Sequence, residues 1–97
     1  MRRVNNEEEL GGVINRLLRA YGLEEGYYTA AVTTYWEKFM GPAVARHTGK
    51  IKIEKGILKV QITSAALRQE LSYGKENIIQ ALNKEIGHRL IQRVEIF

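Results

Sequence analysis

The sequence contains no cysteine and no aspartate, and these two absences exclude a large part of protein chemistry. Without cysteine, the chain has neither a disulfide framework nor a thiolate nucleophile. All eleven acidic residues are glutamate, so no Ser-His-Asp triad can be built. The two histidines, His47 and His88, are far apart in sequence and have no partner at zinc-ligand spacing. We therefore expect a non-enzymatic protein without a metal or other cofactor.

Long apolar segments are also missing. No apolar run approaches the ~20 residues that span a bilayer, and the first ten residues lack the apolar core of a signal peptide. With 97 residues, of which 44% are hydrophobic, the chain has the size and composition of one domain with a single core. We expect a cytoplasmic domain over residues 1–97, with residues 1–5 disordered and no contact with a membrane.

The charge balance is moderately basic, with a formal net charge of +4 and an isoelectric point of about 9.5. A cationic surface favours anionic partners such as nucleic acid. The same balance is common among proteins that bind none, so charge alone does not select a partner.

Two helices are predicted in the first half of the chain. Asn6 is suited to cap the first, which ends at Gly22. The apolar residues of this helix follow helical spacing at Leu10, Val13, Ile14, Leu17, Leu18 and Tyr21. Residues 23–27 are expected to form a loop. A second helix is predicted over 28–40, with Trp36 on its apolar face.

A short helical turn and a hairpin follow. The glycine and proline at 41–42 end the second helix and open the next turn. Alternating apolar residues then predict strands over Lys50–Glu54 and Ile57–Thr63, joined by a tight turn at 55–56.

The register of this hairpin follows from its apolar residues. A two-residue turn sets Ile53 opposite Leu58 and keeps every buried side chain on one face. The same register places Lys52 directly opposite Lys59 on the solvent face, with Lys50 alongside. Facing like charges are mildly destabilising, which indicates either a compensating anion or an edge protected against aggregation.

A helical region and a third strand complete the chain. Ser64 is suited to cap a helix whose apolar face continues as far as Gly87. Gly74 interrupts this face, so the pattern allows one kinked helix or two short ones. Apolar residues alternate from Leu90 to Ile96 in the last strand. The order predicts an α+β fold with a small mixed three-stranded sheet, helices packed on one face and an additional N-terminal helix.

An ordered set of residues along nearly the whole chain resembles the DciA family, long known only as a domain of unknown function. The pattern is W…G…A…HT, an alternating strand pair, a helix opened by serine with a Glu-Leu pair, and Leu-Asn…Gly before the last strand. In this sequence the pattern falls on Trp36, Gly41, Ala45, His47, Thr48, Leu58, Val60, Ser64, Glu70, Leu71, Leu82, Asn83 and Gly87. The Met-Arg-Arg start is typical of short members of the family.

This resemblance implies a KH-like fold of the type II order. It also implies a bacterial replication protein that binds DNA and the replicative helicase and helps place that helicase on single-stranded DNA. Longer members carry a disordered basic tail, so the resemblance implies a short form that consists of the KH-like domain. RNA-binding KH domains usually carry a GXXG loop between two helices. The corresponding residues here, 74–77, read Gly-Lys-Glu-Asn and do not match it.

The candidate contact residues follow from these patterns. We assign nucleic-acid contacts, to single-stranded or duplex DNA or to RNA, to Arg46, Lys50, Lys52 and Lys59. Trp36 is the candidate contact with a protein partner, because tryptophan is enriched at such hot spots, although aromatic residues at helical spacing are mostly core. Two other functions remain open: a KH-like RNA- or ribosome-binding module, and a protein-interaction adaptor without any nucleic-acid role.

Overall fold

The structure, a computed structural model, describes residues 12–14 and 16–97. The expected helix cap at Asn6, the apolar position at Leu10 and the expected disorder of residues 1–5 lie outside these residues. Residues 12–14 and 16–20 are helical, and a turn at Gly22, with φ of 68°, leads into the next helix. No helix in the described part of the chain is both long and apolar enough to cross a membrane.

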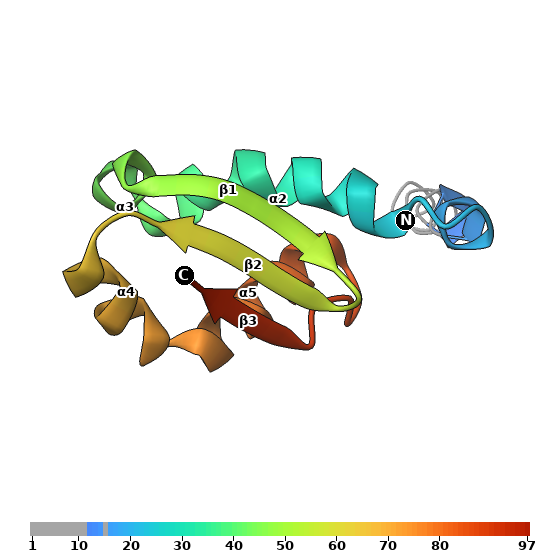
Figure 1. Ribbon diagram of the computed structural model, residues 1–97. Helices are drawn as coiled ribbons and strands as arrows, with labels where there is room; N and C mark the ends of the chain where they lie inside the picture. The colour runs from blue at the N-terminus through green and yellow to red at the C-terminus, as the bar shows by residue number, and fades with distance from the viewer. Residues whose placement is uncertain (1–11, 15) are drawn as a thin grey trace, which may run out of the picture.

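The described elements follow in the order helix, helix, strand, strand, helix, helix, strand (Figure 1). Their bounds are α2 Glu24–Met40, α3 Pro42–Arg46, β1 Thr48–Glu54, β2 Ile57–Ile62, α4 Ala65–Ser72, α5 Lys75–Ile86 and β3 Arg93–Ile96. The strands form one sheet in the order β1-β2-β3, with β2 antiparallel to β1 and parallel to β3. The predicted small mixed sheet is confirmed.

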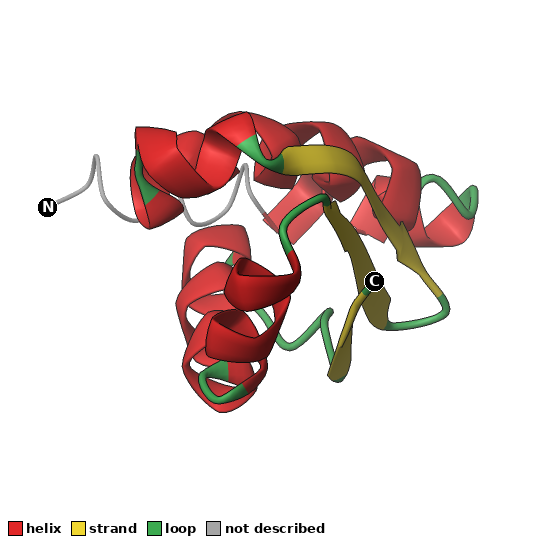
Figure 2. Ribbon diagram, turned by 60° about the vertical axis from the view of Figure 1, so that its left-hand side comes forward, coloured by secondary structure: helices red, strands yellow, loops and turns green. Residues whose placement is uncertain are grey.

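One face of the sheet is covered by helices. In Figure 1, α2 and α5 lie behind the strands, and in Figure 2 the α4–α5 hairpin and the strands lie at opposite sides of the molecule. The buried core residues come from α2, the sheet, α5 and the segment before β3: Tyr28, Val32, Trp36, Ile53, Leu58, Val60, Ile62, Ile78, Leu82, Ile91 and Val94. The face toward the viewer of Figure 1 is left without a helix.

The hairpin register is the predicted one. Ile53 pairs with Leu58, and Lys52 pairs with Lys59. The tight turn has positive φ at both central residues, 54° at Lys55 and 78° at Gly56, as a two-residue hairpin with the right twist requires. Apolar periodicity places Ile51, Leu67 and Leu71 on the core-facing sides of their elements, but the structure leaves them only half-buried, packed against the core.

Several element boundaries differ from the prediction. The expected loop at 23–27 was wrong, because α2 begins at Glu24, one turn before Tyr28. The first turn is held from outside the helix: a Glu24 carboxylate oxygen lies 2.9 Å from His88 Nε2, and Glu25 accepts a hydrogen bond from Gly56 N–H at 2.9 Å. Tertiary contacts therefore decide where α2 starts.

The region around Gly74 contains two helices. The α4 helix ends at Ser72, with Tyr73 and Gly74 forming a two-residue turn before α5. Ser64 caps α4 as predicted, its Oγ accepting from Leu67 N–H at 3.3 Å.

The last strand begins at Arg93 and not at Leu90. The segment before it is fixed by Asn83, whose side chain donates to Ile91 C=O and accepts from Ile91 N–H, both at 2.8 Å. The Asn83 side chain thus pairs with both backbone groups of Ile91, as a neighbouring strand would. Ile91 therefore lies outside the sheet, and β3 begins only at Arg93.

Candidate nucleic-acid interface

The outer face of the sheet carries the predicted pair of facing lysines. Alternation along each strand directs Lys52 and Lys59 away from the core, and the register brings them opposite each other. The Lys52 side chain is 64% exposed and the Lys59 side chain 38%. Lys50, two residues before Lys52, is also exposed. Lys52 and Lys59 therefore form a directly facing pair, whereas Lys50 lies where the register between β1 and β2 shifts, between Thr48 and Ile51.

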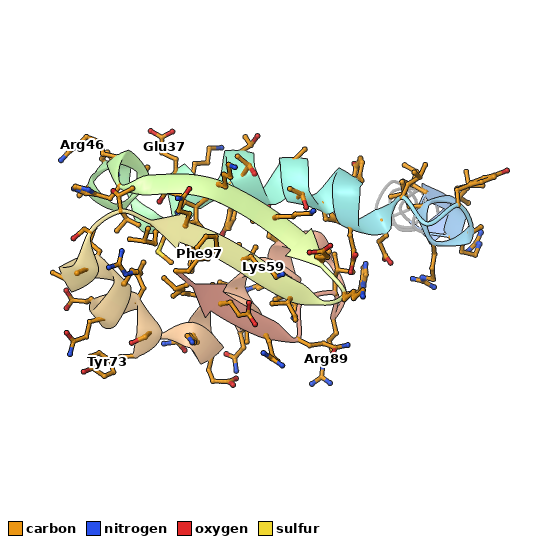
Figure 3. All side chains as sticks on the ribbon, viewed as in Figure 1. Glu37, Arg46, Lys59, Tyr73, Arg89 and Phe97 are labelled. Atoms are coloured by element: carbon orange, nitrogen blue, oxygen red, sulfur yellow. The ribbon has the colours of Figure 1, made fainter. Side chains whose placement is uncertain are left out.

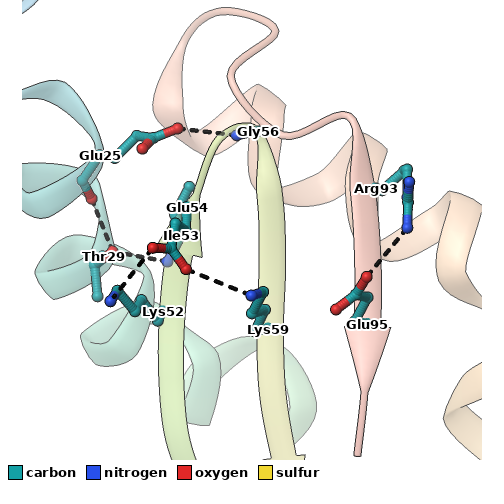
Figure 4. A network of polar contacts seen from close by, with 9 residues as sticks. All are labelled: Glu25, Thr29, Lys52, Ile53, Glu54, Gly56, Lys59, Arg93 and Glu95. Carbon is teal, nitrogen blue, oxygen red and sulfur yellow. Dashed lines mark hydrogen bonds and ion pairs between the residues drawn. The ribbon is translucent and has the colours of Figure 1, made fainter.

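Part of this charge is neutralised by Glu54, which stands two residues after Lys52 on the same face (Figure 4). One carboxylate oxygen lies 3.4 Å from Lys59 Nζ and the other 3.8 Å from Lys52 Nζ. The hydrogen bond from Lys59 and the charge of Lys52 lower the pKa of Glu54 below its usual range. The compensating anion predicted for the lysine pair is thus present within the chain, and the pair alone does not require an external one.

A similar arrangement continues on β3. Lys59 has Glu95 as its neighbour across the parallel pairing, and Arg93 donates to the Glu95 carboxylate at 3.1 Å. The outer face of the three strands carries four cations and two carboxylates: Lys50, Lys52, Lys59 and Arg93 with Glu54 and Glu95. We call these six residues the outer sheet face. Its excess of two positive charges is modest.

Arg46 does not join this face. It is the last residue of α3, and Figure 3 places it at the α3 end of the molecule, well away from Lys59 over the middle of the sheet. Residues 47–49 carry the chain around the corner into β1 before the lysines begin. The structure therefore does not bring Arg46 together with the three lysines, although nucleic-acid contacts were assigned to all four from the sequence.

A groove of about 650 Å³ borders the lysines on the side of α2. Its walls include Lys50 and Lys52 from β1, together with Gly22 and Gly26 from the other side. No heavy atom lies within 4 Å of the position of a Cβ at either glycine, so a ligand backbone can approach closely. The groove therefore has lysines along one side and glycines without side chains along the other.

The polar groups inside this groove are already paired. Thr29 Oγ1 accepts from Ile53 N–H at 3.0 Å and donates to Glu25 C=O at 2.7 Å. The carboxylate of Glu25 accepts from Gly56 N–H. At the rim, Lys52 is partly neutralised by Glu54, which also lines the groove, and the ammonium groups of Lys50 and Lys52 are the cations that an incoming anion would meet.

Trp36 is a core residue, and the assignment of this side chain as a partner contact was wrong. The residue is 2% exposed, and its indole Nε1–H donates to Thr48 Oγ1 at 3.0 Å. Thr48 in turn donates to Val44 C=O at 2.8 Å. These bonds join α2, α3 and β1 at one point, and the indole presents no surface to another molecule.

The histidines have structural contacts. His47 Nδ1 lies 3.3 Å from Thr63 Oγ1, and His47 C=O accepts from Thr63 N–H at 2.7 Å, which closes the open end of the hairpin. His88 lies edge-to-face against Tyr28, with ring centroids 5.7 Å apart. Within residues 12–14 and 16–97, no three His or Glu side chains are grouped so that they could hold a metal ion.

These features define a small α+β domain with a mixed three-stranded sheet and a cationic, helix-free outer face. The family profile described as "Dna[CI] antecedent, DciA" matches residues 9–96. The chain belongs to the DciA family, as the resemblance in its sequence predicts.

Two relatives with similar sequences are both named "UPF0232 protein". The protein from Corynebacterium glutamicum (strain R) is 28% identical over 96 residues, which cover 99% of this chain and 54% of that protein. The protein from Streptomyces avermitilis is 27% identical over 89 residues, which cover 90% of this chain and 49% of that protein. The chain therefore spans about half the length of these relatives.

Proposed function

We propose that this domain is a non-enzymatic accessory module of bacterial DNA replication that binds the replicative helicase and single-stranded DNA and helps bring them together. The observation that carries this proposal is the DciA profile match over residues 9–96. Membership in this family favours a role in helicase loading. The described surface adds a physical candidate for each of the two contacts.

The candidate DNA contact is the outer sheet face with the adjoining groove. Its two excess positive charges favour contact with a phosphate backbone, and contacts to a phosphate backbone carry no sequence information directly. Binding through this face is therefore expected to be independent of sequence and sensitive to salt.

A KH-like RNA- or ribosome-binding module is the second candidate function. The parallel pairing of β2 and β3 around the α4–α5 crossover supports a KH-like arrangement of the type II order. The turn between these helices contains only Tyr73 and Gly74, which is too short for the four-residue loop that clamps nucleotides in RNA-binding KH domains. This favours DNA-backbone contact over clamped RNA recognition.

Replacing both facing lysines, Lys52→Gln with Lys59→Gln, is expected to weaken binding to single-stranded DNA and to flatten its dependence on salt. Each phosphate contact adds roughly 0.7 to the slope of log K against log salt on single strands, so the double variant is expected to lose about 1.4. Titration of labelled single-stranded DNA at several salt concentrations measures this slope. Stability is expected to change little, because the charges are exposed and partly offset by Glu54.

The matched control is Lys38→Gln with Lys84→Gln, which removes the same charge from exposed positions on α2 and α5. An equal loss of slope in this control would show that only net charge matters. An unchanged slope in the Lys52/Lys59 variant would leave these lysines as edge protection. Parallel titrations with duplex DNA and RNA of equal length separate the DNA role from the RNA role, and no salt-sensitive binding to any of them would favour a protein-interaction adaptor.

A further inference from the structure

The exposed large apolar side chains of this domain are concentrated in one short stretch. Six of them lie within residues 13–27, and their exposed fractions lie between 42% for Val13 and 74% for Tyr21. The six side chains concerned, which we call the N-terminal apolar strip, are Val13, Ile14, Leu17, Tyr21, Leu23 and Tyr27. In the remainder of the described chain, only Tyr73 and Phe97 are comparably exposed large apolar residues.

The strip continues across the turn between the N-terminal helical segment and α2. Leu17 and Tyr21 are one helical turn apart, with Tyr21 N–H donating to Leu17 C=O at 3.1 Å. Leu23 and Tyr27 repeat this spacing on α2, where Tyr27 N–H donates to Leu23 C=O at 3.0 Å. Leu18 packs against the core and fixes the orientation of the segment, which lies at the end of the molecule away from the sheet (Figure 1).

Six exposed large apolar side chains within residues 13–27 make this segment the strongest candidate for a partner-binding surface in the described part of the chain. Burial contributes roughly 25 cal/mol for each Å² of apolar area removed from water, and monomers rarely leave large contiguous apolar patches exposed. Four of the six side chains are aliphatic and have no π-face on which a nucleotide base could stack. The composition of the strip therefore fits a protein surface better than a nucleic acid.

The charges beside the strip indicate the polarity of that surface. Arg16 and Arg19 are both exposed on the helical segment that carries Leu17. The nearby acids are less exposed: Glu24 has a carboxylate oxygen 2.9 Å from His88 Nε2 and a side chain 15% exposed, and Glu25 accepts a hydrogen bond from Gly56 N–H. The exposed charges beside the described strip are thus those of Arg16 and Arg19, and a complementary surface is acidic.

We propose that the N-terminal apolar strip is the docking surface for the replicative helicase, and that it receives an amphipathic helix whose apolar stripe is flanked by glutamate or aspartate. The i, i+4 spacing of the strip is the spacing by which two helices pack their apolar faces together. Arg16 and Arg19 pair with the acidic flank and set the orientation. This inference rests on the proposed function, which names the helicase as the partner. It assigns the helicase contact to the exposed strip and no longer to Trp36.

The test is binding of the purified replicative helicase from the same organism to the immobilised domain. The variant Leu17→Ser with Tyr21→Ser is expected to weaken binding at least tenfold. The matched control Tyr73→Ser removes an equally exposed tyrosine from the α4–α5 turn and is expected to bind as the wild type does. Arg16→Glu, which changes charge without removing apolar area, is expected to weaken binding and to reduce its sensitivity to salt.

The outcomes separate this inference from the proposed function. If the wild type binds the helicase and the Leu17/Tyr21 variant binds equally well, the docking surface is overturned while the helicase role stands. If the wild type does not bind the helicase, both fail. Loss of self-association or of single-stranded DNA binding in the Leu17/Tyr21 variant, with helicase binding intact, would assign the strip to a second copy or to nucleic acid and would also overturn the proposal. Unchanged circular dichroism melts of all variants confirm that they remain folded.

Discussion

Replacing Trp36 with alanine is expected to unfold the domain. The side chain is among the largest fully buried ones, and truncation of a buried aromatic residue to alanine costs about 3–5 kcal/mol. The total stability of small domains lies at the lower end of about 5–15 kcal/mol, so this loss removes most of it. The bond from Nε1 to Thr48 Oγ1, which ties α2 to β1, is lost as well. Urea unfolding followed by far-ultraviolet circular dichroism measures the effect.

Two controls isolate the causes. Trp36→Phe keeps most of the apolar volume and loses the hydrogen bond, so a smaller cost of roughly 1–2 kcal/mol is expected beyond any packing defect. Tyr73→Ala truncates an exposed aromatic residue and is expected to leave the midpoint unchanged. A Trp36→Ala protein that melts like the wild type but loses helicase binding would contradict the core assignment and restore Trp36 as a partner contact.

Replacing Asn83 with alanine is expected to cost about 2–4 kcal/mol, since it leaves both backbone groups of buried Ile91 without their partners. The two bonds hold the segment between α5 and β3, so their loss is also expected to free the start of β3. Hydrogen exchange at the Ile91 amide reports this directly, because among the described residues its N–H donates only to Asn83 Oδ1.

The control for Asn83 is Gln80→Ala, which truncates an exposed amide side chain one turn earlier on α5. This variant is expected to leave both stability and exchange at Ile91 unchanged. Equal protection of the Ile91 amide in Asn83→Ala and in the wild type would show that the sheet, and not Asn83, holds this segment.

The hairpin was predictable from the sequence because its information is local. Strict alternation and a two-residue turn fix which side chains face each other, so the pairing of Lys52 with Lys59 followed without knowledge of the fold. The same alternation also places Glu54 on the face of Lys52, because the two residues are two positions apart on the strand. Direct cross-strand pairing shows only the two lysines, because Glu54 pairs with Ile57 and reaches Lys59 diagonally.

Other features depend on contacts that span the chain. The start of α2 depends on His88 and on the backbone of Gly56, which are distant in sequence. The segment before β3 depends on Asn83, for which the family pattern gives a position but no contact. Apolar spacing in residues 13–21 predicted a helix and could not show that most of its apolar face stays exposed, because periodicity does not say what covers a face.

We propose that this one small domain contacts the helicase through the N-terminal apolar strip and DNA through the outer sheet face. The most direct test measures how much replicative helicase becomes bound to single-stranded DNA with and without the domain, at near-physiological salt. The wild type is expected to increase this amount, and the Lys52/Lys59 and Leu17/Tyr21 variants are each expected to reduce the increase, while Tyr73→Ser leaves it intact. No increase with the wild type would contradict both proposed contacts, and so would an increase with each double variant that equals the increase with the wild type.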